Sequence, residues 1–169
     1  GGLLKYQANL VLIGMPYAGK SYLGLTLSKI FGKEYFDPDR ELAKEHEDLP
    51  SVIASKGLSY FRKREAEITG AAAHSWNQVI ACGGGIVLSP EVMSELQANG
   101  VIIFLDTPLS ELEKRIDGTR PLVQNREDLE RLYRERIALY RHYAQITIKN
   151  EELTEIVVKI NEYLSHQWS

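Results

Sequence analysis

The feature that most constrains the fold is a glycine-rich segment near the N-terminus, Gly14-Met15-Pro16-Tyr17-Ala18-Gly19-Lys20-Ser21. It matches the pattern G-x-x-x-x-G-K-[ST], in which glycines let backbone N–H groups approach phosphate oxygens and the lysine adds a positive charge. The apolar run at residues 10–13 predicts a buried strand before it, and the stripe Leu23, Leu27, Ile30 and Phe31 predicts a helix after it. Strand, glycine loop and helix together predict a phosphate site. The alternative is an ordinary glycine-rich turn with an exposed lysine.

Length and composition favour one globular domain over residues 1–169, with a core at about 9–166. The net charge of -3 provides no basic field for nucleic acid, and no apolar run is long enough to span a membrane. The single cysteine, Cys82, is typical of a reducing compartment, and we expect it to be a small buried strand residue. Because the N-terminus also lacks a basic and then apolar signal segment, we expect a cytoplasmic protein.

Strand and helix signals alternate along the whole chain. Gly32 should end the first helix, and Ser59 should cap the N-terminus of a helix that runs to about residue 74. Further strands are expected at 34–36, 79–82, 101–105 and 146–148, and further helices at 40–47, from 50, from 90 to 99, 107–117, 128–143 and from 153 along a stripe that begins at Leu153. This order predicts a three-layer α/β/α fold around a five-stranded parallel sheet, with ligands beyond the carboxyl ends of the strands.

Two carboxylates end the second predicted strand, in Asp37-Pro38-Asp39. One could organise Mg²⁺, together with the Ser21 hydroxyl, and the other could accept or orient a substrate hydroxyl as a general base. The alternative is a simple turn in which Asp39 caps the next helix. Close to a phosphate loop, the functional interpretation is favoured.

A run of three glycines, Gly83-Gly84-Gly85, follows the third predicted strand and would let a ligand touch the backbone. The alternative is a flexible loop. Residues 118–127 are polar and aperiodic, which predicts a lid, and Arg120 within it could close over a transferred phosphoryl group. Taken alone, Arg120, Arg62 and Arg136 would each be interpreted as ordinary surface arginines.

In their order and spacing these segments resemble the shikimate kinase family. The likeness covers about residues 9–143, and its short pieces are specific as a set. They are the segment 14–21, residues 36–39, Phe61-Arg62 with Glu65, the glycine run, Arg120-Pro121-Leu122, and Arg136 before Leu139-Tyr140. The resemblance implies the P-loop kinase fold and a monomer. It also implies transfer of the ATP γ-phosphate to the 3-hydroxyl of shikimate, giving shikimate 3-phosphate and ADP on the route to aromatic amino acids.

The resemblance implies a role for each matching position. Asp39, Lys20 and Arg120 would be catalytic, Ser21 and Asp37 would serve Mg²⁺, and residues 38–75 would form substrate-binding helices. The ATP site would comprise Gly14, Met15, Pro16, Tyr17, Ala18, Gly19, Lys20, Ser21, Tyr22, Arg115 and Arg120. The shikimate site would comprise Asp39, Phe61, Arg62, Gly83, Gly84, Gly85 and Arg136, with the two arginines on the carboxylate.

Three departures accompany this likeness. Tyr22 stands where the family often has Thr, Ala138 stands where it has Pro, and residues 149–153 lack the Arg or Pro that often lies near the adenine. Two alternatives therefore remain at this stage. One is a kinase for another small acid, such as gluconate. The other is a catalytically silent nucleotide-binding relative, although such a protein would be expected to have lost at least one of the proposed catalytic residues.

Overall fold

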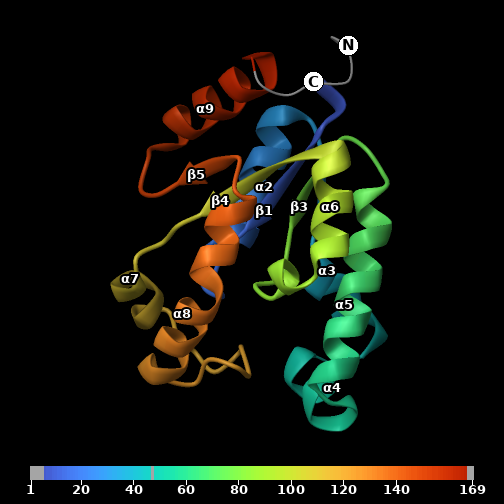
Figure 1. Cartoon of the computed structure of the whole chain (residues 1–169), viewed down its shortest axis with the longest axis vertical. Coiled ribbons are helices and arrows are strands. Elements are labelled where there is room, and N and C mark those ends of the chain that lie inside the picture. Colours follow the sequence, from blue (N-terminus) through green and yellow to red (C-terminus); the bar gives the residue numbers. More distant parts are fainter. Residues whose placement is uncertain (1–5, 47, 167–169) are drawn as a thin grey trace.

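The computed structural model describes residues 6–46 and 48–166 and is built on one sheet of five strands (Figure 1). The strands are β1 (Asn9–Ile13), β2 (Glu34–Phe36), β3 (Gln78–Ala81), β4 (Gly100–Leu105) and β5 (Ile146–Ile148). Their order across the sheet is β2-β3-β1-β4-β5, and all four pairings are parallel. The predicted five-stranded parallel sheet is therefore confirmed.

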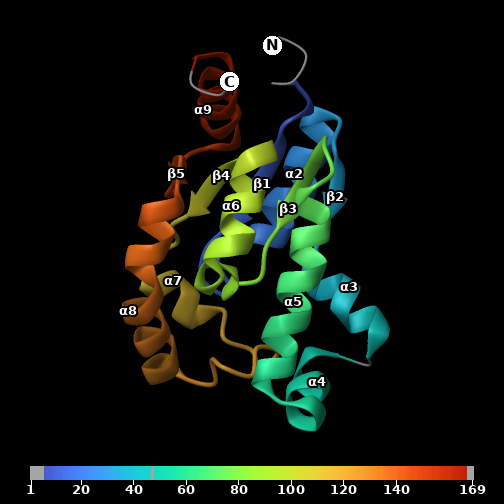
Figure 2. The same ribbon diagram turned by 45° about the vertical axis from the view of Figure 1, so that its right-hand side comes forward.

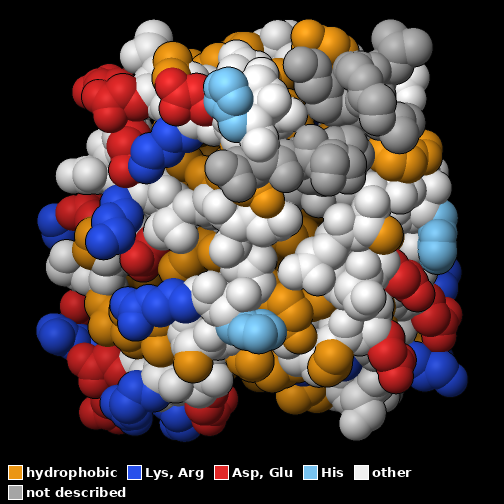
Figure 3. Space-filling view, turned by 45° about the horizontal axis from the view of Figure 1, so that its top comes forward, with side chains coloured by type: hydrophobic (Ala, Val, Ile, Leu, Met, Phe, Trp, Pro, Cys, Tyr) orange, Lys and Arg blue, Asp and Glu red, His pale blue; other side chains and the backbone are white. Residues whose placement is uncertain are grey.

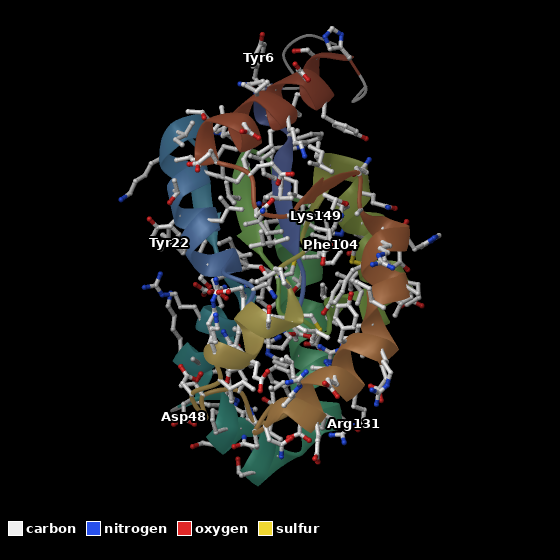
Figure 4. All side chains as sticks on the ribbon, turned by 90° about the vertical axis from the view of Figure 1, so that its left-hand side faces the viewer. Tyr6, Tyr22, Asp48, Phe104, Arg131 and Lys149 are labelled. Atoms are coloured by element: carbon white, nitrogen blue, oxygen red, sulfur yellow. The ribbon has the colours of Figure 1, made fainter. Side chains whose placement is uncertain are left out.

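Helices cover both faces of this sheet, as the alternating pattern predicts. Seen edge-on, α2 lies on one side of the strands and α8 on the other (Figure 4). The helices are α2 (Lys20–Phe31), α3 (Pro38–Glu45), α4 (Leu49–Lys56), α5 (Leu58–Ala73), α6 (Pro90–Asn99), α7 (Leu109–Lys114), α8 (Arg126–Tyr143) and α9 (Leu153–His166), with a short 3₁₀ turn η1 at Ile86–Leu88. The three-layer α/β/α architecture is thus also confirmed.

The described residues contain two separate apolar clusters. The large one surrounds β1, β3 and β4, which are buried along their whole length, as central parallel strands should be. The small one joins Leu42, Val52 and Phe61 from α3, α4 and α5. These three helices extend below the sheet (Figure 2), so the lower tip of the molecule is stabilised by its own contacts.

Several predicted boundaries differ from the structure. Ser59 does not cap α5; the cap residue is Gly57, which also ends α4 and has a φ of 89°. Because one residue makes the whole turn between the two helices, Ser59 lies inside the first turn of α5. Helix α7 ends at Lys114 rather than near 117. The prediction that Gly32 ends α2 is confirmed, with a φ of 64°.

Two residues of the predicted apolar stripes are exposed, Ile30 by 47% and Leu153 by 40%. On α2 the buried face includes Gly24 and Ser28 beside Leu23 and Leu27. Gly24 and Ser28 are small, so the helix can lie close to the sheet. A methyl group on Gly24 would lie 2.8 Å from the ring of Tyr35. The buried face of α2 therefore includes two small residues and excludes Ile30, which the apolar pattern alone would bury.

The connection between α7 and α8 spans residues 115–125, so the predicted lid at 118–127 includes the first residues of α8. None of the helices in the described ranges has the length and hydropathy needed to cross a bilayer. On the face shown in Figure 3, acidic and basic side chains are interspersed.

Candidate active site

A cleft lies at the carboxyl ends of the strands and encloses a cavity of about 340 Å³, a size suited to small metabolites. Four segments that are distant in sequence meet there: the glycine loop after β1, the turn after β2, the glycine run after β3, and the connection before α8. Every residue predicted for the site lines this cleft except Gly14 and Met15. Residues that line it without having been predicted for it include Glu65, Leu49, Ile53, Asp117 and Thr119.

The glycine loop is folded around the ammonium group of Lys20. Lys20 Nζ donates to the carbonyl oxygens of Gly14 at 2.5 Å and Met15 at 3.0 Å. These two residues therefore hold the lysine through their backbone, although they do not line the cleft. A methyl group on Gly14 would lie 2.8 Å from the Leu105 carbonyl oxygen, so the loop passes close to β4. Burial, followed by the charge of Arg120, lowers the pKa of Lys20 to about 8.

Tyr17 is a non-glycine residue with a φ of 71° within this loop, an uncommon conformation for a bulky side chain. Its carbonyl oxygen accepts a hydrogen bond from Arg115 Nη1 at 2.9 Å, and the next carbonyl, of Ala18, accepts one from Thr107 at 2.9 Å. Arg115, predicted for the ATP site, thus lies against the glycine loop. Tyr22 lies at the rim of the cleft on α2 and is 80% exposed (Figure 4).

Asp37 connects the glycine loop to α3 through its two oxygens. Oδ1 accepts from the backbone N–H of Asp39 at 3.0 Å and of Arg40 at 3.3 Å, so Asp37, and not Asp39, is the N-cap of α3. Oδ2 accepts from the hydroxyl of Ser21 at 3.4 Å and from that of Tyr35 at 3.2 Å. The capping alternative for Asp39 is therefore wrong, and its side chain is left for the cleft.

The Ser21 hydroxyl and the Asp37 carboxylate form a pair of neighbouring oxygen donors, the type that Mg²⁺ prefers. Within the described residues there is no cluster of three His, Cys, Asp or Glu side chains that could hold a metal unaided. A site of this kind suits Mg²⁺ that arrives with a nucleotide, because phosphate oxygens and water would supply the remaining ligands.

Asp39 lines the cleft and, among the described residues, has one carboxylate oxygen without a partner. Its Oδ2 accepts from Arg120 Nη1 at 3.1 Å, whereas its buried Oδ1 has no hydrogen-bond partner in the part of the chain that the structure describes. Burial raises the pKa of the Asp39 carboxyl, and the charge of Arg120 opposes this rise. A buried carboxylate oxygen without a partner is costly, so this geometry suits a ligand hydroxyl.

The two arginines of the acceptor side lie on opposite walls of the cleft. Arg136, on α8, is only 3% exposed, and among the described residues it forms no salt bridge. Arg62, on α5, lies 3.9 Å from the Glu65 carboxylate through Nη1. Burial and the like charge of Arg136 lower the pKa of Arg62. Both guanidinium groups lie against the glycine run, Arg62 beside Gly85 and Arg136 beside Gly84. A buried, unpaired guanidinium group favours binding of an anion.

The three glycines lie between these charged groups, and their lack of side chains is required. A methyl group on Gly83 would overlap the Glu65 carboxylate, and one on Gly85 would overlap the Arg62 guanidinium. One on Gly84 would lie 3.1 Å from Arg136 Nη1. The run is therefore not a loop that is merely flexible, since its backbone forms a wall on which three charged side chains lie.

Three residues of this region were not singled out as functional from the sequence: Glu65, Tyr35 and Tyr140. Burial, with a smaller contribution from Asp39, raises the pKa of Glu65 to about 7. Its spacing of three from Arg62 on a helix was the signal that could have placed it in the cleft. Tyr35 and Tyr140 carried no such signal, because their contacts with Asp37 and Gly84 depend on the tertiary fold. Cys82 is buried as predicted, next to β3, and burial raises the pKa of its thiol.

Comparison of the sequence with known proteins identifies the family of this chain. The shikimate kinase family model matches residues 16–165. A shikimate kinase from Clostridium botulinum (strain Okra / Type B1) is 39% identical over 160 residues, which cover 90% of this chain and 93% of that protein.

Solved structures give the same result. A shikimate kinase from Acinetobacter baumannii in complex with shikimate aligns with a TM-score of 0.87 and 27% identity over 99% of both chains. A shikimate kinase from Aquifex aeolicus aligns with a TM-score of 0.80 and 28% identity, over 94% of this chain and 98% of that one. The chain therefore belongs to the shikimate kinase family of ATP-dependent phosphotransferases.

Proposed function

We propose a role for each cleft residue in the reaction of this family, the transfer of the ATP γ-phosphate to the 3-hydroxyl of shikimate. The nucleotide side comprises the loop Gly14–Ser21, with Tyr22 at its rim and Arg115 beside it. The backbone N–H groups of the loop and the N-terminus of α2 bind the phosphates. Lys20 exchanges its bonds to the Gly14 and Met15 carbonyls for phosphate oxygens.

Mg²⁺ is the proposed cofactor, and Ser21 and Asp37 are the residues that would hold it. When bound, Mg²⁺ neutralises charge on the phosphate oxygens. Asp37 is already oriented for this task, since hydrogen bonds from the α3 backbone fix one of its oxygens. The hydroxyl of Tyr35 donates to the other oxygen and helps to fix its direction.

The acceptor side binds shikimate through its carboxylate and its hydroxyls. Arg136 and Arg62 pair with the carboxylate, a task suited to the planar guanidinium fork. The free Oδ1 of Asp39 accepts the hydroxyl group that attacks, and orients or deprotonates it. Phe61 and the backbone of Gly83, Gly84 and Gly85 complete the wall.

Arg120 joins the two sides. It contacts Asp39 at 3.1 Å, and its charge lowers the pKa of Lys20, the phosphate-binding lysine. Over the transferred phosphoryl group, its guanidinium would stabilise the charge that develops on the equatorial oxygens. Closure of residues 118–127 would also exclude water that otherwise hydrolyses ATP.

The observation that carries this assignment is the unpaired state of Arg136. A guanidinium group that is 3% exposed and lacks a carboxylate partner among the described residues is strongly destabilising unless a ligand supplies the anion. With Arg62 on the facing helix and a hydroxyl acceptor at Asp39, the cleft matches a small acid that also carries hydroxyl groups.

We further propose that the chain acts as a single domain and as a monomer in the cytoplasm, on small molecules and without nucleic acid or membrane partners. The monomer assignment follows from the resemblance to the shikimate kinase family. The net charge of -3 and the single buried Cys82 support the other two assignments.

The test is ADP production from ATP and Mg²⁺ with shikimate, with gluconate and with no acceptor. We expect strong stimulation by shikimate alone, and loss of that stimulation in Arg136→Ala at low shikimate concentration. Stimulation by gluconate instead would reassign the acceptor. ATP binding without stimulation by either acid would indicate a silent nucleotide-binding protein and would overturn the assignment.

A further inference from the structure

Tyr140 is a buried polar residue at the back of the acceptor side, and the roles proposed above leave it without a function. It lies on α8, one helical turn after Arg136, and its side chain is fully buried. Its hydroxyl donates to the carbonyl oxygen of Gly84 at 2.5 Å. It therefore links the helix that carries Arg136 directly to the glycine run.

The position of the Tyr140 ring is fixed from the sheet. The ring stacks on Phe104 of β4, with centroids 5.2 Å apart and an interplanar angle of 20°. Phe104 is itself buried and lies between the sheet and α8 (Figure 4). Because the ring is both stacked and fully buried, the hydroxyl has little freedom to move.

Tyr140 and Arg136 lie on the same face of α8, because residues four apart on a helix are neighbours. Both side chains reach Gly84: the Tyr140 hydroxyl bonds to its carbonyl oxygen, and Arg136 Nη1 lies beside its Cα. Burial raises the pKa of Tyr140 to about 12, and the positive charge of Arg136 acts in the opposite direction.

The hydrogen bond of the phenol proton connects Tyr140 to the surroundings of Arg136. The Tyr140 hydroxyl donates its proton to the Gly84 carbonyl and so holds this part of the glycine run against α8. Gly84 in turn lies so close to Arg136 that a methyl group on it would be 3.1 Å from Nη1. Gly84, Tyr140 and Arg136 therefore form one connected unit.

From this unit we infer that Tyr140 is a positioning residue for shikimate, holding the Arg136 guanidinium group and the Gly84 backbone in one fixed relation. The inference rests on the proposed carboxylate role of Arg136. Without the hydroxyl, the Gly84 carbonyl loses its donor and the backbone beside Arg136 is no longer held, while the nucleotide side keeps all its contacts. The loss should appear in shikimate binding and not in ATP binding.

The test is steady-state kinetics of Tyr140→Phe, which removes one oxygen and keeps the ring on Phe104. We expect the KM for shikimate to rise about tenfold, as for a carbonyl that is left without its donor, and the KM for ATP to stay within about twofold. The matched control is Tyr163→Phe, which removes a hydroxyl bonded to Gln145 outside the cleft. We expect it to change neither KM.

A double-mutant cycle with Arg136→Ala separates positioning from a general packing effect. If Tyr140 acts through Arg136, then Tyr140→Phe should add almost nothing to the shikimate KM once Arg136 is absent. Fully additive effects, an unchanged shikimate KM, or an equal rise in both KM values would overturn the inference.

Two further outcomes are distinct from these. If the wild type is not stimulated by shikimate, the proposed function fails and the inference with it. If the wild type is stimulated and Arg136→Ala is impaired while Tyr140→Phe is not, the inference alone fails. Should Tyr140→Phe not fold, Phe104→Leu tests the same unit, because it keeps the hydroxyl but removes the stacked ring. A selective rise in the shikimate KM is again expected, and its absence would overturn the inference.

Discussion

The two sides of the cleft are built in different ways. The nucleotide side is one continuous segment, Gly14–Ser21, and its proposed binding groups are mostly backbone N–H groups with one lysine. The acceptor side collects side chains from α3, α5 and α8, and they meet on the backbone of the glycine run. It holds two arginines and two carboxyl groups in a largely buried space.

The two sides should therefore be damaged by different kinds of substitution. A backbone site depends on the conformation of its loop, and single side chains other than Lys20 contribute little to it. An acceptor site made of buried charges depends on every partner, because each charge that loses its partner must be desolvated alone. The mutations below should therefore divide into effects on chemistry, on one substrate, or on stability.

The largest effect is expected for Arg120→Ala, because Arg120 belongs to neither side and joins them. Loss of an arginine that stabilises a transferred phosphoryl group typically costs about 10³-fold or more in kcat. We expect such a loss with near-normal affinity for both substrates, measured by single-turnover kinetics and calorimetry. Arg126→Ala, which removes an exposed arginine paired with Glu113 and Glu130, is the control. An unchanged kcat in Arg120→Ala would make Arg120 a bystander.

Lys20→Ala should damage the nucleotide side alone. Removal of one charged donor from the phosphate site is expected to lower kcat on the order of 10²–10³-fold and to weaken ATP, while calorimetric shikimate affinity stays within about twofold. Lys29→Ala, an exposed lysine on the same helix, should behave as wild type. Near-normal turnover in Lys20→Ala would contradict the phosphate role of the loop.

Asp39→Asn should damage the acceptor side and spare the nucleotide. Loss of the proposed base predicts a fall in kcat of about 10²-fold, with ATP affinity unchanged by fluorescence titration. Asp48→Asn is a suitable control, since Asp48 caps α4 outside the cleft. If ATP binding fails in Asp39→Asn instead, the roles of Asp37 and Asp39 have been exchanged.

Glu65→Gln should give the smallest effect, seen in stability against pH. A carboxyl group whose pKa rises to about 7 on folding leaves the folded state with more bound protons than the unfolded state between its ordinary pKa and 7. Stability therefore falls as pH rises through this window and is level above it. The variant should lose less stability than the wild type between pH 5 and pH 8, by on the order of 1–2 kcal/mol.

Thermal unfolding at a series of pH values measures this difference. Glu67→Gln is the control, because Glu67 is an exposed residue on the same helix and pairs with Arg64. Parallel plots of stability against pH for wild type and Glu65→Gln would contradict the prediction, because they would mean that folding does not raise the pKa of Glu65.

The contrast between the two sides also explains what the sequence could predict. The alternation of strands and helices was sufficient for the sheet, and the glycine loop was visible because its residues are contiguous. On the acceptor side, Arg62 and Arg136 look like other surface arginines, and only the family resemblance singled them out. Their burial becomes evident only when α5 and α8 face each other across the glycine run.

Local boundaries failed where one residue serves two neighbours. Gly57 ends α4 and begins α5, so the cap predicted at Ser59 has no place. On α2, the approach of Gly24 to the Tyr35 ring exposes Ile30, although its spacing fits an apolar stripe. Both errors arise from packing between elements, which propensities and periodicity within one segment do not contain.

The double use of Asp37 has a consequence for how this enzyme tolerates change. One carboxylate oxygen anchors the first turn of the helix that carries Asp39, and the other meets Ser21. A replacement of Asp37 would therefore disturb the position of Asp39 and would also remove an oxygen ligand from the nucleotide end of the cleft. Selection that preserves the helix cap would also preserve the oxygen next to Ser21, and the reverse holds as well. Descendants of this chain should therefore vary less at Asp37 than at residues with only one role.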